Sequence, residues 1–290
     1  MDTNRESLEL SLLAEDVEIR YDAARAIARQ GRSVLPIVEE WTQDTRPRLR
    51  EMAAFILGQV HDPNSERRYE LITYERGLTI LMGLLQTDHD SEVRSNAAIA
   101  LGQYADPVGI PSLVAAASDT SDVVRFGVAS ALGSYFGCNW TAENRQFKNS
   151  IRKALLRLMD DEDDDVRDWA TFGIHQGGHN TITTRRRLWK ALDDPVCDVR
   201  GEAAEGLAIF GDRTLIPRLE DLLRDDEDIS PCYFSAAEEL GDPVLLPAVL
   251  YGQERWSDIM EEGEEMHHYI TSAIETLEKA LARQAKRRKS

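Results

Sequence analysis

The stretch EVRSNAAIALG, residues 92–102, decides the fold, because the same order of residue types recurs along the chain. Each copy has an apolar residue followed by arginine, then small apolar residues, and often a closing Leu-Gly. Further copies are EIRYDAARAIA (18–28), RLREMAAFILG (48–58), VVRFGVASALG (123–133), DVRDWATFGIH (165–175) and DVRGEAAEGLA (198–208). A seventh, PCYFSAAEELG (231–241), has Tyr233 in place of the arginine. Such self-similarity indicates a repeat protein.

The spacing of the repeated arginine gives the length of the unit. These arginines are Arg20, Arg50, Arg94, Arg125, Arg167 and Arg200, and successive ones lie 30, 44, 31, 42 and 33 residues apart. A unit of about 31 to 33 residues accounts for the short separations. Extra segments near 61–74 and 136–147 account for the two long ones.

Each copy is followed by a second apolar segment, so every repeat predicts a pair of helices. Several of these segments open with proline, which the first turn of a helix tolerates; the prolines are Pro36, Pro107, Pro111, Pro217, Pro243 and Pro247. Glycines are expected to end the helices that carry the arginines; they are Gly58, Gly102, Gly133, Gly211 and Gly241. Since no stretch alternates with period two between hairpin signals, we expect no sheet.

The sequence therefore predicts an all-α solenoid of about seven helix pairs over residues 1–251. Residues 252–290 are expected to form a capping helix, from about residue 260 to 286, with a short basic tail. Apolar residues recur along that helix at steps of three to four; they are Ile270, Ile274, Leu277 and Leu281. Such a helix would cover the open end of the core.

The pattern resembles the HEAT-like repeat of the phycobilisome-lyase type, over roughly residues 7–251. In that family each arginine contacts an acidic residue of the turn between helices, which forms a polar ladder through the stack. The resemblance therefore implies a structural ladder made by the six arginines. The pairs it implies are Asp90 with Arg94, Asp122 with Arg125, Asp164 with Arg167, and Asp198 with Arg200.

Composition limits the class of partner. Of the 290 residues, 42% are hydrophobic and 30% charged, which is typical of a folded protein. The net charge of −18 disfavours nucleic acid and favours a basic partner. No apolar run is long enough to span a bilayer, and the acidic start MDTNRESLELSLLAED is unlike a signal peptide. With three cysteines and no CxxC spacing, we expect a cytoplasmic protein without disulfides.

The resemblance places the arginine-bearing helix on the concave side of the solenoid. Its valine, first alanine and leucine recur at four-residue steps and should point into the core, so positions two and six after the valine should face the groove. With their neighbours, these positions give a candidate binding surface: Tyr21, Phe55, Ile99, Phe126, Trp169, Phe172, Glu202, Glu205, Phe234 and Glu238. Large apolar groups beside carboxylates fit a partner with apolar anchors and basic flanks. The alternative is that strong curvature packs these side chains into an inner core layer.

The two inserted segments are a second candidate, because extra segments on one edge of a solenoid often contact partners. Their aromatic residues are Tyr69, Tyr74, Tyr135 and Trp140. The alternative is that the segments only lengthen helices.

We expect binding rather than catalysis, with no cofactor, metal or catalytic residue. The chain has no GxxxxGK[ST], GxGxxG or GxSxG motif and no His-Glu dipeptide. His175 and His179 have the i, i+4 spacing of a metal pair, but Gly177 and Gly178 interrupt the helix between them. The expected function is a protein- or peptide-binding scaffold, adaptor, or regulatory or neutralising partner. The alternative, implied by the resemblance, is a phycobilin-lyase-like enzyme or a chaperone that handles a tetrapyrrole on a protein.

Overall fold

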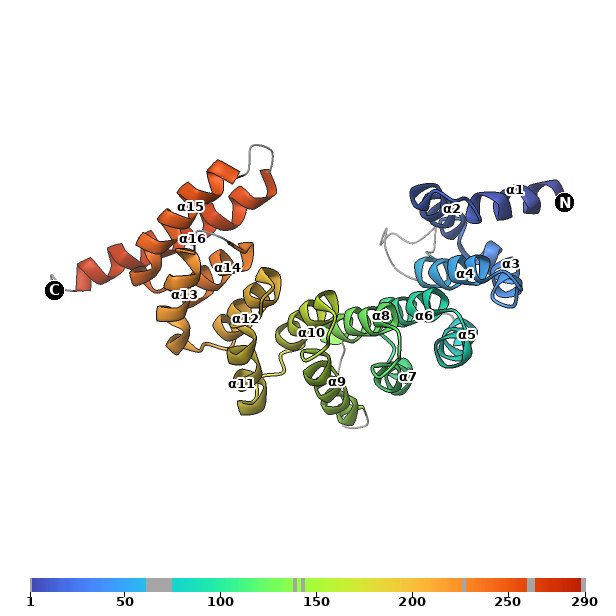
Figure 1. Cartoon of the computed structure of the whole chain (residues 1–290), viewed down its shortest axis with the longest axis horizontal. Helices are drawn as coiled ribbons and strands as arrows, with labels where there is room; N and C mark the ends of the chain where they lie inside the picture. Colours follow the sequence, from blue (N-terminus) through green and yellow to red (C-terminus); the bar gives the residue numbers. More distant parts are fainter. Residues whose placement is uncertain are drawn as a thin grey trace. The chain divides into compact units, whose positions relative to one another are not determined.

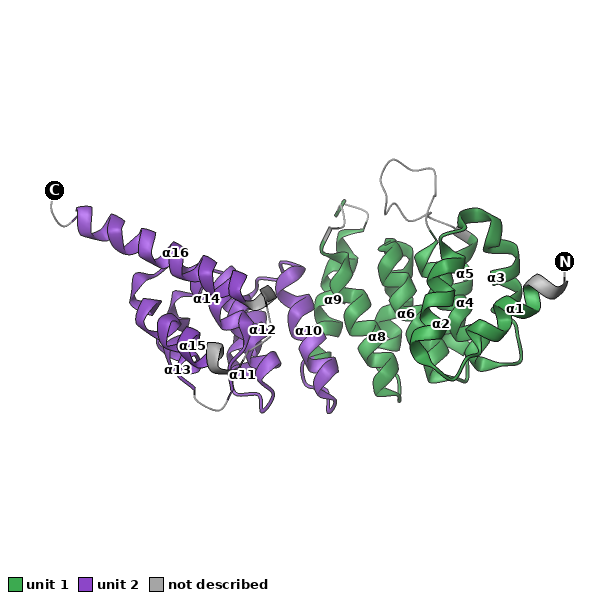
Figure 2. Cartoon of the chain, turned by 90° about the horizontal axis from the view of Figure 1, so that it is seen from above, with its two compact units in different colours: residues 1–158 green, residues 159–290 purple. Residues whose placement is uncertain are grey.

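The computed structural model describes residues 2–60, 75–137, 140–141, 144–225, 228–259 and 264–287, and these residues form two compact units, 1–158 and 159–290 (Figure 2). Within the described residues every regular element is helical. The first unit contains α1 (Asp2–Leu12), α2 (Val17–Ala28), α3 (Leu35–Trp41), α4 (Pro47–Gln59), α5 (Glu75–Thr87), α6 (Ser91–Tyr104), α7 (Ile110–Ala116), α8 (Asp122–Gly133) and α9 (Arg145–Leu158). The second contains α10 (Asp164–Gln176), α11 (Ile182–Ala191), α12 (Cys197–Ile209), α13 (Ile216–Leu223), α14 (Pro231–Leu240), α15 (Leu246–Ile259) and α16 (Glu264–Arg287). The predicted all-α solenoid is confirmed.

The helices of each unit stack in two rows (Figure 1). One row contains the arginine helices, which carry the repeated block: α2, α4, α6 and α8 in the first unit, and α10, α12 and α14 in the second. Each arginine helix packs on the next within its unit, and α16 continues the row beyond α14. The other row contains outer helices, including α5, α7 and α9 in the first unit and α13 and α15 in the second. Every repeat thus buries its apolar side against its neighbours.

Small residues set the distance between the arginine helices. The core positions of α6 behave as predicted, because Val93, Ala97 and Leu101 are all fully buried. A Cβ atom on Gly102 would lie 2.5 Å from the Cα of Ala131 in α8. Gly102 therefore allows two helix backbones to approach closely, which a larger residue would prevent.

The prediction that glycine ends the arginine helices is correct at some copies and wrong at others. Gly58 and Gly102 lie inside α4 and α6, which continue to Gln59 and Tyr104. By contrast, Gly241 caps α14 in the left-handed conformation, with φ of 56°. The Leu-Gly signal thus marks close packing in the first unit, because the glycine faces the next helix before its own helix ends.

The prolines open the outer helices as predicted. In four repeats a short 3₁₀ turn precedes the α-helix; the turns are η1 (Gly31–Val34), η2 (Pro107–Gly109), η4 (Arg213–Leu215) and η5 (Pro243–Leu245), and η3 (Ser134–Gly137) follows α8. Pro36, Pro111 and Pro217 occupy the first two positions of α3, α7 and α13. Proline has no N–H group, and the N–H groups of the first helical turn have no partner within the helix. Proline at these positions therefore costs no helical hydrogen bond.

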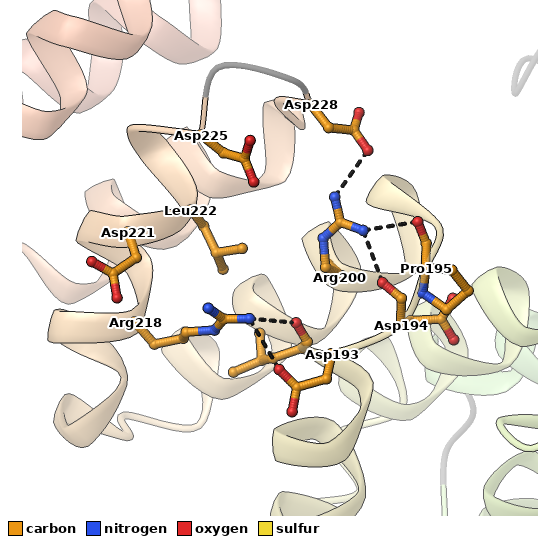
Figure 3. Close-up of a pocket in the computed structure, with 10 residues that line it drawn as sticks. Asp193, Asp194, Pro195, Arg200, Arg218, Asp221, Leu222, Asp225 and Asp228 are labelled. Atoms are coloured by element: carbon orange, nitrogen blue, oxygen red, sulfur yellow. Dashed lines mark hydrogen bonds and ion pairs between the residues drawn. The ribbon is translucent and has the colours of Figure 1, made fainter.

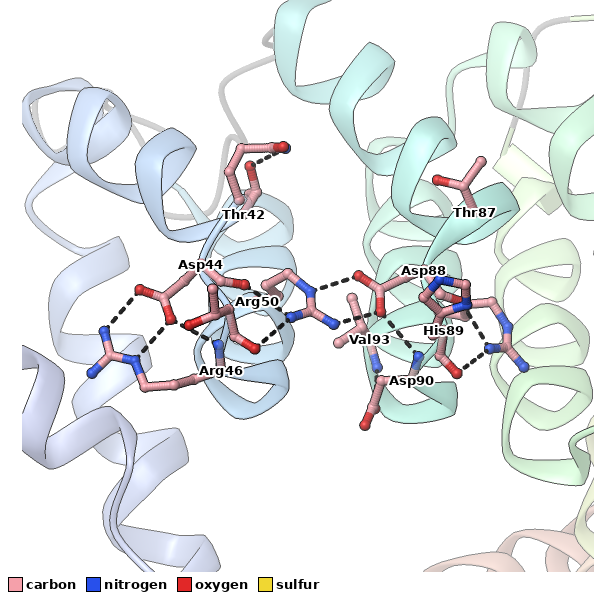
Figure 4. A network of polar contacts seen from close by, with 12 residues as sticks. Thr42, Asp44, Arg46, Arg50, Thr87, Asp88, His89, Asp90 and Val93 are labelled. Atoms are coloured by element: carbon pink, nitrogen blue, oxygen red, sulfur yellow. Dashed lines mark hydrogen bonds and ion pairs between the residues drawn. The ribbon is translucent and has the colours of Figure 1, made fainter.

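The repeated arginines form a polar ladder, as the resemblance implied (Figure 4). Arg50 donates from Nε and Nη2 to the two carboxylate oxygens of Asp88, at 2.7 and 2.8 Å. Its Nη1 also donates to the carbonyl of Asp44, six residues earlier, at 2.9 Å. The same carbonyl contact, six residues back, recurs at all six arginines. The ladder therefore joins each turn to an arginine helix and, through the carboxylate, to the next repeat.

Three of the carboxylates implied by the resemblance, Asp90, Asp164 and Asp198, are the wrong ones. The observed partners lie in the following turn; they pair Arg50 with Asp88, Arg94 with Asp119, Arg167 with Asp194, and Arg200 with Asp228. The pair of Asp122 with Arg125 stays a prediction. Asp90 is the N-cap of α6, and its carboxylate accepts from the N–H groups of Glu92 and Val93. The other three implied carboxylates belong to the first turns of their helices, where they favour the positive end of the helix dipole.

The C-terminal helix α16 packs on α14 and α15. Ile270 and Leu277 are buried, Ile274 is half-buried, and Leu281 is 46% exposed. The apolar stripe predicted for this helix therefore contacts the repeats at its first three residues and is open to water at Leu281. The assignment of residues 252–290 as a separate capping segment stays a prediction.

Candidate binding surface

We define the arginine-helix face of each unit as the side chains on its arginine helices that the neighbouring helices leave at least partly uncovered. In the first unit this face is aromatic and apolar. Tyr21 and Phe55 meet edge to face, with ring centroids 4.8 Å apart, and both are half-buried. The Tyr21 hydroxyl donates to Glu51 Oε1 at 3.4 Å. Burial, followed by the charge of Glu51, raises the pKa of Tyr21.

Ile99 and Phe126 belong to the same face and are also half-buried. Phe55 and Ile99 occupy position six after the core residue of the block, which is partly open as predicted. Position two is often closed instead, because it lies at the contact between neighbouring arginine helices. Ser95, at that position, is buried, and its hydroxyl donates to the carbonyl of Val123 at 2.9 Å.

In the second unit the face begins with an aromatic row along α10. Trp169, Phe172 and His175 follow one another at steps of three residues. The rings of Trp169 and Phe172 meet edge to face at 5.6 Å, and those of Phe172 and His175 do so at 5.5 Å. Exposure falls along the row, from 36% for Trp169, through half-buried Phe172, to 3% for His175. The row thus exposes the Trp169 ring to water, while the Phe172 and His175 rings that support it are packed against the protein.

Carboxylates stand beside this row. His175 Nε2 lies 2.6 Å from Glu202 Oε2, and Glu205 is one turn further along α12. Asp168 precedes Trp169 on α10, and burial, followed by the charges of Glu202 and Asp198, raises its pKa to about 7. Burial and then the charge of Glu202 also raise the pKa of Glu205. The fold therefore places several carboxyl groups close together in a partly buried site, although burial and mutual repulsion disfavour their charged forms.

Sequence reasoning missed two members of this cluster, His175 and Cys232. The Cys232 thiol, at the start of α14, lies 3.5 Å from Glu202 Oε1. His175 was compared with His179, but α10 ends at Gln176, so the i, i+4 relation does not apply. The useful signal was the three-residue step from Trp169 through Phe172, which places His175 on the same side of α10.

Two predicted surface residues are not at the surface. Phe234 is fully buried and Tyr135 is 2% exposed. A Cβ atom on Gly252 would lie 3.1 Å from the Phe234 ring, so α15 covers this aromatic side chain. The Tyr135 hydroxyl donates to the carbonyl of Asp106 at 2.9 Å, which fixes the residue in the core of its repeat.

The remaining predicted residues fall into two groups. Glu238 is half-buried, and its Oε1 accepts a hydrogen bond of 2.6 Å from the Ser272 hydroxyl of α16. Trp140 is half-buried. Tyr69 and Tyr74 lie outside the described residues.

Clefts also open along the ladder edge, but their charges pair with one another. A cleft of about 680 Å³ lies between the turns before α12 and α14 (Figure 3). In it Arg200 donates to Asp228, and Arg218 donates to Asp193 at 3.0 Å. Equivalent clefts of about 540 and 490 Å³ contain Arg167 and Arg50. Since each contains a ladder arginine bound to its own carboxylate, these clefts follow from the repeat geometry.

Comparison with known proteins agrees with this architecture. The HEAT repeats family matches the sequence over residues 70–133 and 151–241. The chain belongs to the HEAT repeat family. Its arginine helices, outer helices and ladder are therefore the parts of HEAT repeats.

Individual relatives resemble the chain over most of its length. Protein YibA of Escherichia coli K12 is 28% identical over 271 residues, which cover 90% of this chain and 86% of YibA. The X-ray structure of E. coli YibA has a TM-score of 0.66 at 26% identity and covers 94% of this chain and 92% of that one. The complex of CpcE and CpcF of phycocyanin lyase from Nostoc has a TM-score of 0.51 at 16% identity, over 83% of this chain and 93% of that one. The last likeness concerns the fold alone.

Among the described helices, none combines the length and apolar character that crossing a membrane requires.

Proposed function

We propose that this HEAT repeat chain is a protein-binding scaffold or adaptor that holds a basic and apolar segment of a partner on its arginine-helix faces. The observation that carries the proposal is the arrangement in the second unit. There exposed Trp169 begins the aromatic row that ends at His175, and His175 contacts Glu202. Neither Glu202 nor Glu205 forms an ion pair with a described lysine or arginine.

Trp169 has the properties of an anchor for a partner. Its ring rests edge-on against Phe172 and is 36% exposed, so a partner side chain can cover it without displacing the helix. Large aromatic groups with a packed base contribute strongly to interfaces, because they bury much apolar area at little entropy cost. Covering such a ring stabilises a complex by about 1 to 3 kcal/mol.

The carboxylates supply charge complementarity. Most ladder aspartates are held by arginines, whereas Glu202 contacts only His175 and the Cys232 thiol among the described residues. Burial, and then repulsion from Glu202, raises the pKa values of Asp168 and Glu205, and a lysine or arginine of a partner would relieve the repulsion. Such pairing favours basic partners and rejects acidic ones.

The face of the first unit offers apolar contacts to the same class of partner. Phe55, Ile99 and Phe126 are each half-buried, so part of each side chain is open to water. We therefore include them, with Tyr21 and Glu238, in the proposed binding surface. The half-buried Trp140 of the insertion is a further proposed contact.

The test uses two synthetic peptides of equal length, one of alternating arginine and leucine and one with glutamate for each arginine. We expect the full chain to bind the first peptide, with affinity falling as salt rises, and to reject the second. Trp169→Ala should weaken binding about tenfold, since 1.4 kcal/mol is a factor of ten, while helicity by circular dichroism stays unchanged. Equal binding of both peptides, or of wild type and variant, would refute the proposal.

Handling of a tetrapyrrole would be a different function, and the phycocyanin lyase likeness supports it only through the fold. Incubating the chain with a free bilin separates the two functions. On our proposal the bilin absorbance spectrum stays unchanged, whereas a shift in the spectrum would favour the lyase function.

A further inference from the structure

We propose that His175, Glu202, Glu205 and Cys232 form a binding site for a divalent transition-metal ion of the Zn²⁺ class. The inference does not rest on the proposed function, because a metal ion would occupy Glu202 and Glu205 in place of a partner's lysine or arginine.

The geometry brings three ligand types together. One ligand atom from each of His175, Glu202 and Glu205 lies within 4.8 Å of those of the other two. Bonds of zinc to nitrogen and oxygen are about 2.0 to 2.2 Å long, so one ion can reach all three after small rotations of the glutamates. Cys232 Sγ, 3.5 Å from Glu202 Oε1, is placed to be the fourth ligand. Cys232 lies outside the group of three, beside Glu202, so rotation of its side chain would complete the four-ligand set that zinc prefers.

Glycines allow these side chains to meet. A Cβ atom on Gly206 would lie 3.1 Å from the Cβ of His175, and one on Gly201 would lie 3.2 Å from the Cβ of Cys232. These two glycines flank Glu202 and Glu205 on α12, so α10 and α14 approach α12 where the glutamates project. The close approach is built into the backbone of the second unit.

The charge of the cluster is not balanced by protein cations. Among the described residues, no lysine or arginine forms an ion pair with Glu202 or Glu205. Elsewhere in the fold an arginine balances the charge of such a carboxylate. At Asp194, for example, Arg167 donates two hydrogen bonds. Burial, with the charges of Glu202 and Glu205, also raises the pKa of the Cys232 thiol. A bound dication would reverse this balance.

His175 directs one ring nitrogen into the cluster. Its side chain is fully buried, its Nε2 lies 2.6 Å from Glu202 Oε2, and its Nδ1 has no hydrogen-bond partner among the described residues. Nε2 is therefore the nitrogen that a bound ion would contact.

The ligand types select the metal. One nitrogen, two carboxylates and one sulfur suit Zn²⁺ or Co²⁺, whereas Mg²⁺ and Ca²⁺ prefer oxygen alone. On binding, the thiol of Cys232 gives its proton to solvent and binds as thiolate, and the imidazole of His175 stays neutral by carrying its one proton on Nδ1 while Nε2 binds the ion.

Calorimetric titration of the chelator-treated full chain tests the site. We expect one equivalent of Zn²⁺ to bind and Mg²⁺ not to compete. Glu202→Gln and Glu205→Gln should each weaken zinc binding at least about tenfold, as loss of a ligand does. Glu278→Gln, the same change at an exposed position of α16, should leave binding unchanged. Equal affinity in all three variants, or no zinc binding by the folded wild type, would overturn the inference.

Cobalt provides a readout that is specific for the thiolate. Co²⁺ bound to the wild type should show a sulfur-to-metal charge-transfer band, which Cys232→Ser abolishes and Cys197→Ser retains. Cys197 is the matched control, because it lies on α12 and its Sγ contacts the Tyr233 hydroxyl rather than the cluster. This comparison stays informative if a glutamate variant fails to fold.

The adjacent histidines His267 and His268 on α16 are the competing explanation for zinc binding. Both are exposed. The double variant His267→Gln, His268→Gln should keep the wild-type affinity. If it loses zinc binding while Glu205→Gln keeps it, the ion binds at α16 and the inference is wrong. A failure of either kind leaves the peptide experiment intact, because that experiment is carried out in chelator.

Discussion

The arginine-helix faces of the two units use one scaffold for two kinds of surface. Position six of the block is apolar in two of the four copies of the first unit, Phe55 and Ile99, and is glutamate in the last two copies of the second, Glu205 and Glu238. The core residues and the ladder arginine are shared by both units, since Arg94 and Arg167 make the same contacts. The core residues and ladder arginines that recur from repeat to repeat thus stabilise the fold, whereas position six, which differs between repeats, supplies the binding chemistry.

If the ladder is the shared scaffold, breaking it should cost the same in either unit. Arg94→Ala leaves Asp119 without its counter-ion, and Arg167→Ala does the same to Asp194. All four side chains are between 12% and 15% exposed. We expect each variant to lose about 3 kcal/mol of unfolding free energy, as for removal of one partner of a buried pair. Denaturant unfolding measures this loss.

The exposed pair of Lys279 and Glu275 on α16 is the control for the ladder. Lys279→Ala should cost no more than about 0.5 kcal/mol. If both ladder variants lose less than about 1 kcal/mol of unfolding free energy, the ladder does not stabilise the shared scaffold.

The two units also differ in what a glycine of an arginine helix packs against. Gly102→Ala in the first unit places a methyl group against the backbone of Ala131, which cannot move aside. Gly201→Ala in the second meets side-chain atoms instead, the Ser230 hydroxyl and, at 2.8 Å, the Ser230 Cβ. We expect a loss of about 2 kcal/mol for the first change and a smaller loss for the second. Thermal melting of the two variants decides the order.

Substitution of the partly exposed aromatic side chains tests whether the arginine-helix faces bind a peptide. Phe172→Asp in the second unit should weaken binding of the arginine–leucine peptide by about 1.5 kcal/mol, and Phe126→Ala in the first by less. Circular dichroism and melting provide the check on folding. If helicity is lost with either change, the side chain belongs to the core, and the surface is misassigned at that residue.

The two units also differ in a pH dependence of opposite sign. The pKa of Asp168 is raised to about 7, above its value in the unfolded chain, so the folded state holds the extra proton between about pH 4 and 7. Stability from this group therefore falls as pH rises through that window. Arg46 lowers the pKa of Asp44 to about 2, so the stability that this ion pair adds is lost only as pH falls below about 4.

Hydrogen exchange of the full chain in chelator measures both effects. From pH 5 to 8 the amides of α10 should lose protection in the wild type and lose less in Asp168→Asn. Identical pH profiles for wild type and variant would show that Asp168 is not held protonated.

Most of the fold was predictable from the sequence, because Val93, Ala97 and Leu101 keep a four-residue step that only a helix buries. The ladder partners were missed because proximity in sequence favoured Asp90. The repeated signal was an aspartate six residues before the arginine, as at Asp44, Asp88 and Asp119. The carboxylate of each accepts the N–H two residues on. Asp88 and Asp119 then pair with the preceding ladder arginine, whereas Asp44 pairs with Arg46.

The binding face was harder to predict, because its exposure depends on neighbours that are distant in sequence. Phe234 occupies a position that is open on other helices, but α15 covers it. Conversely, His175 and Cys232 lie in different blocks, and only the close approach of α10, α12 and α14 brings them to Glu202. A single repeat contains no information about either relation.

The most direct test of the central claim is chemical-shift mapping of the arginine–leucine peptide on the isotopically labelled full chain, in chelator. The account predicts that perturbed resonances cluster at Trp169, Phe172, Glu202 and Glu205, with weaker changes at Phe55 and Ile99. Perturbations confined to the ladder edge, around Arg200 and Asp228, or spread evenly over the acidic surface, would contradict it.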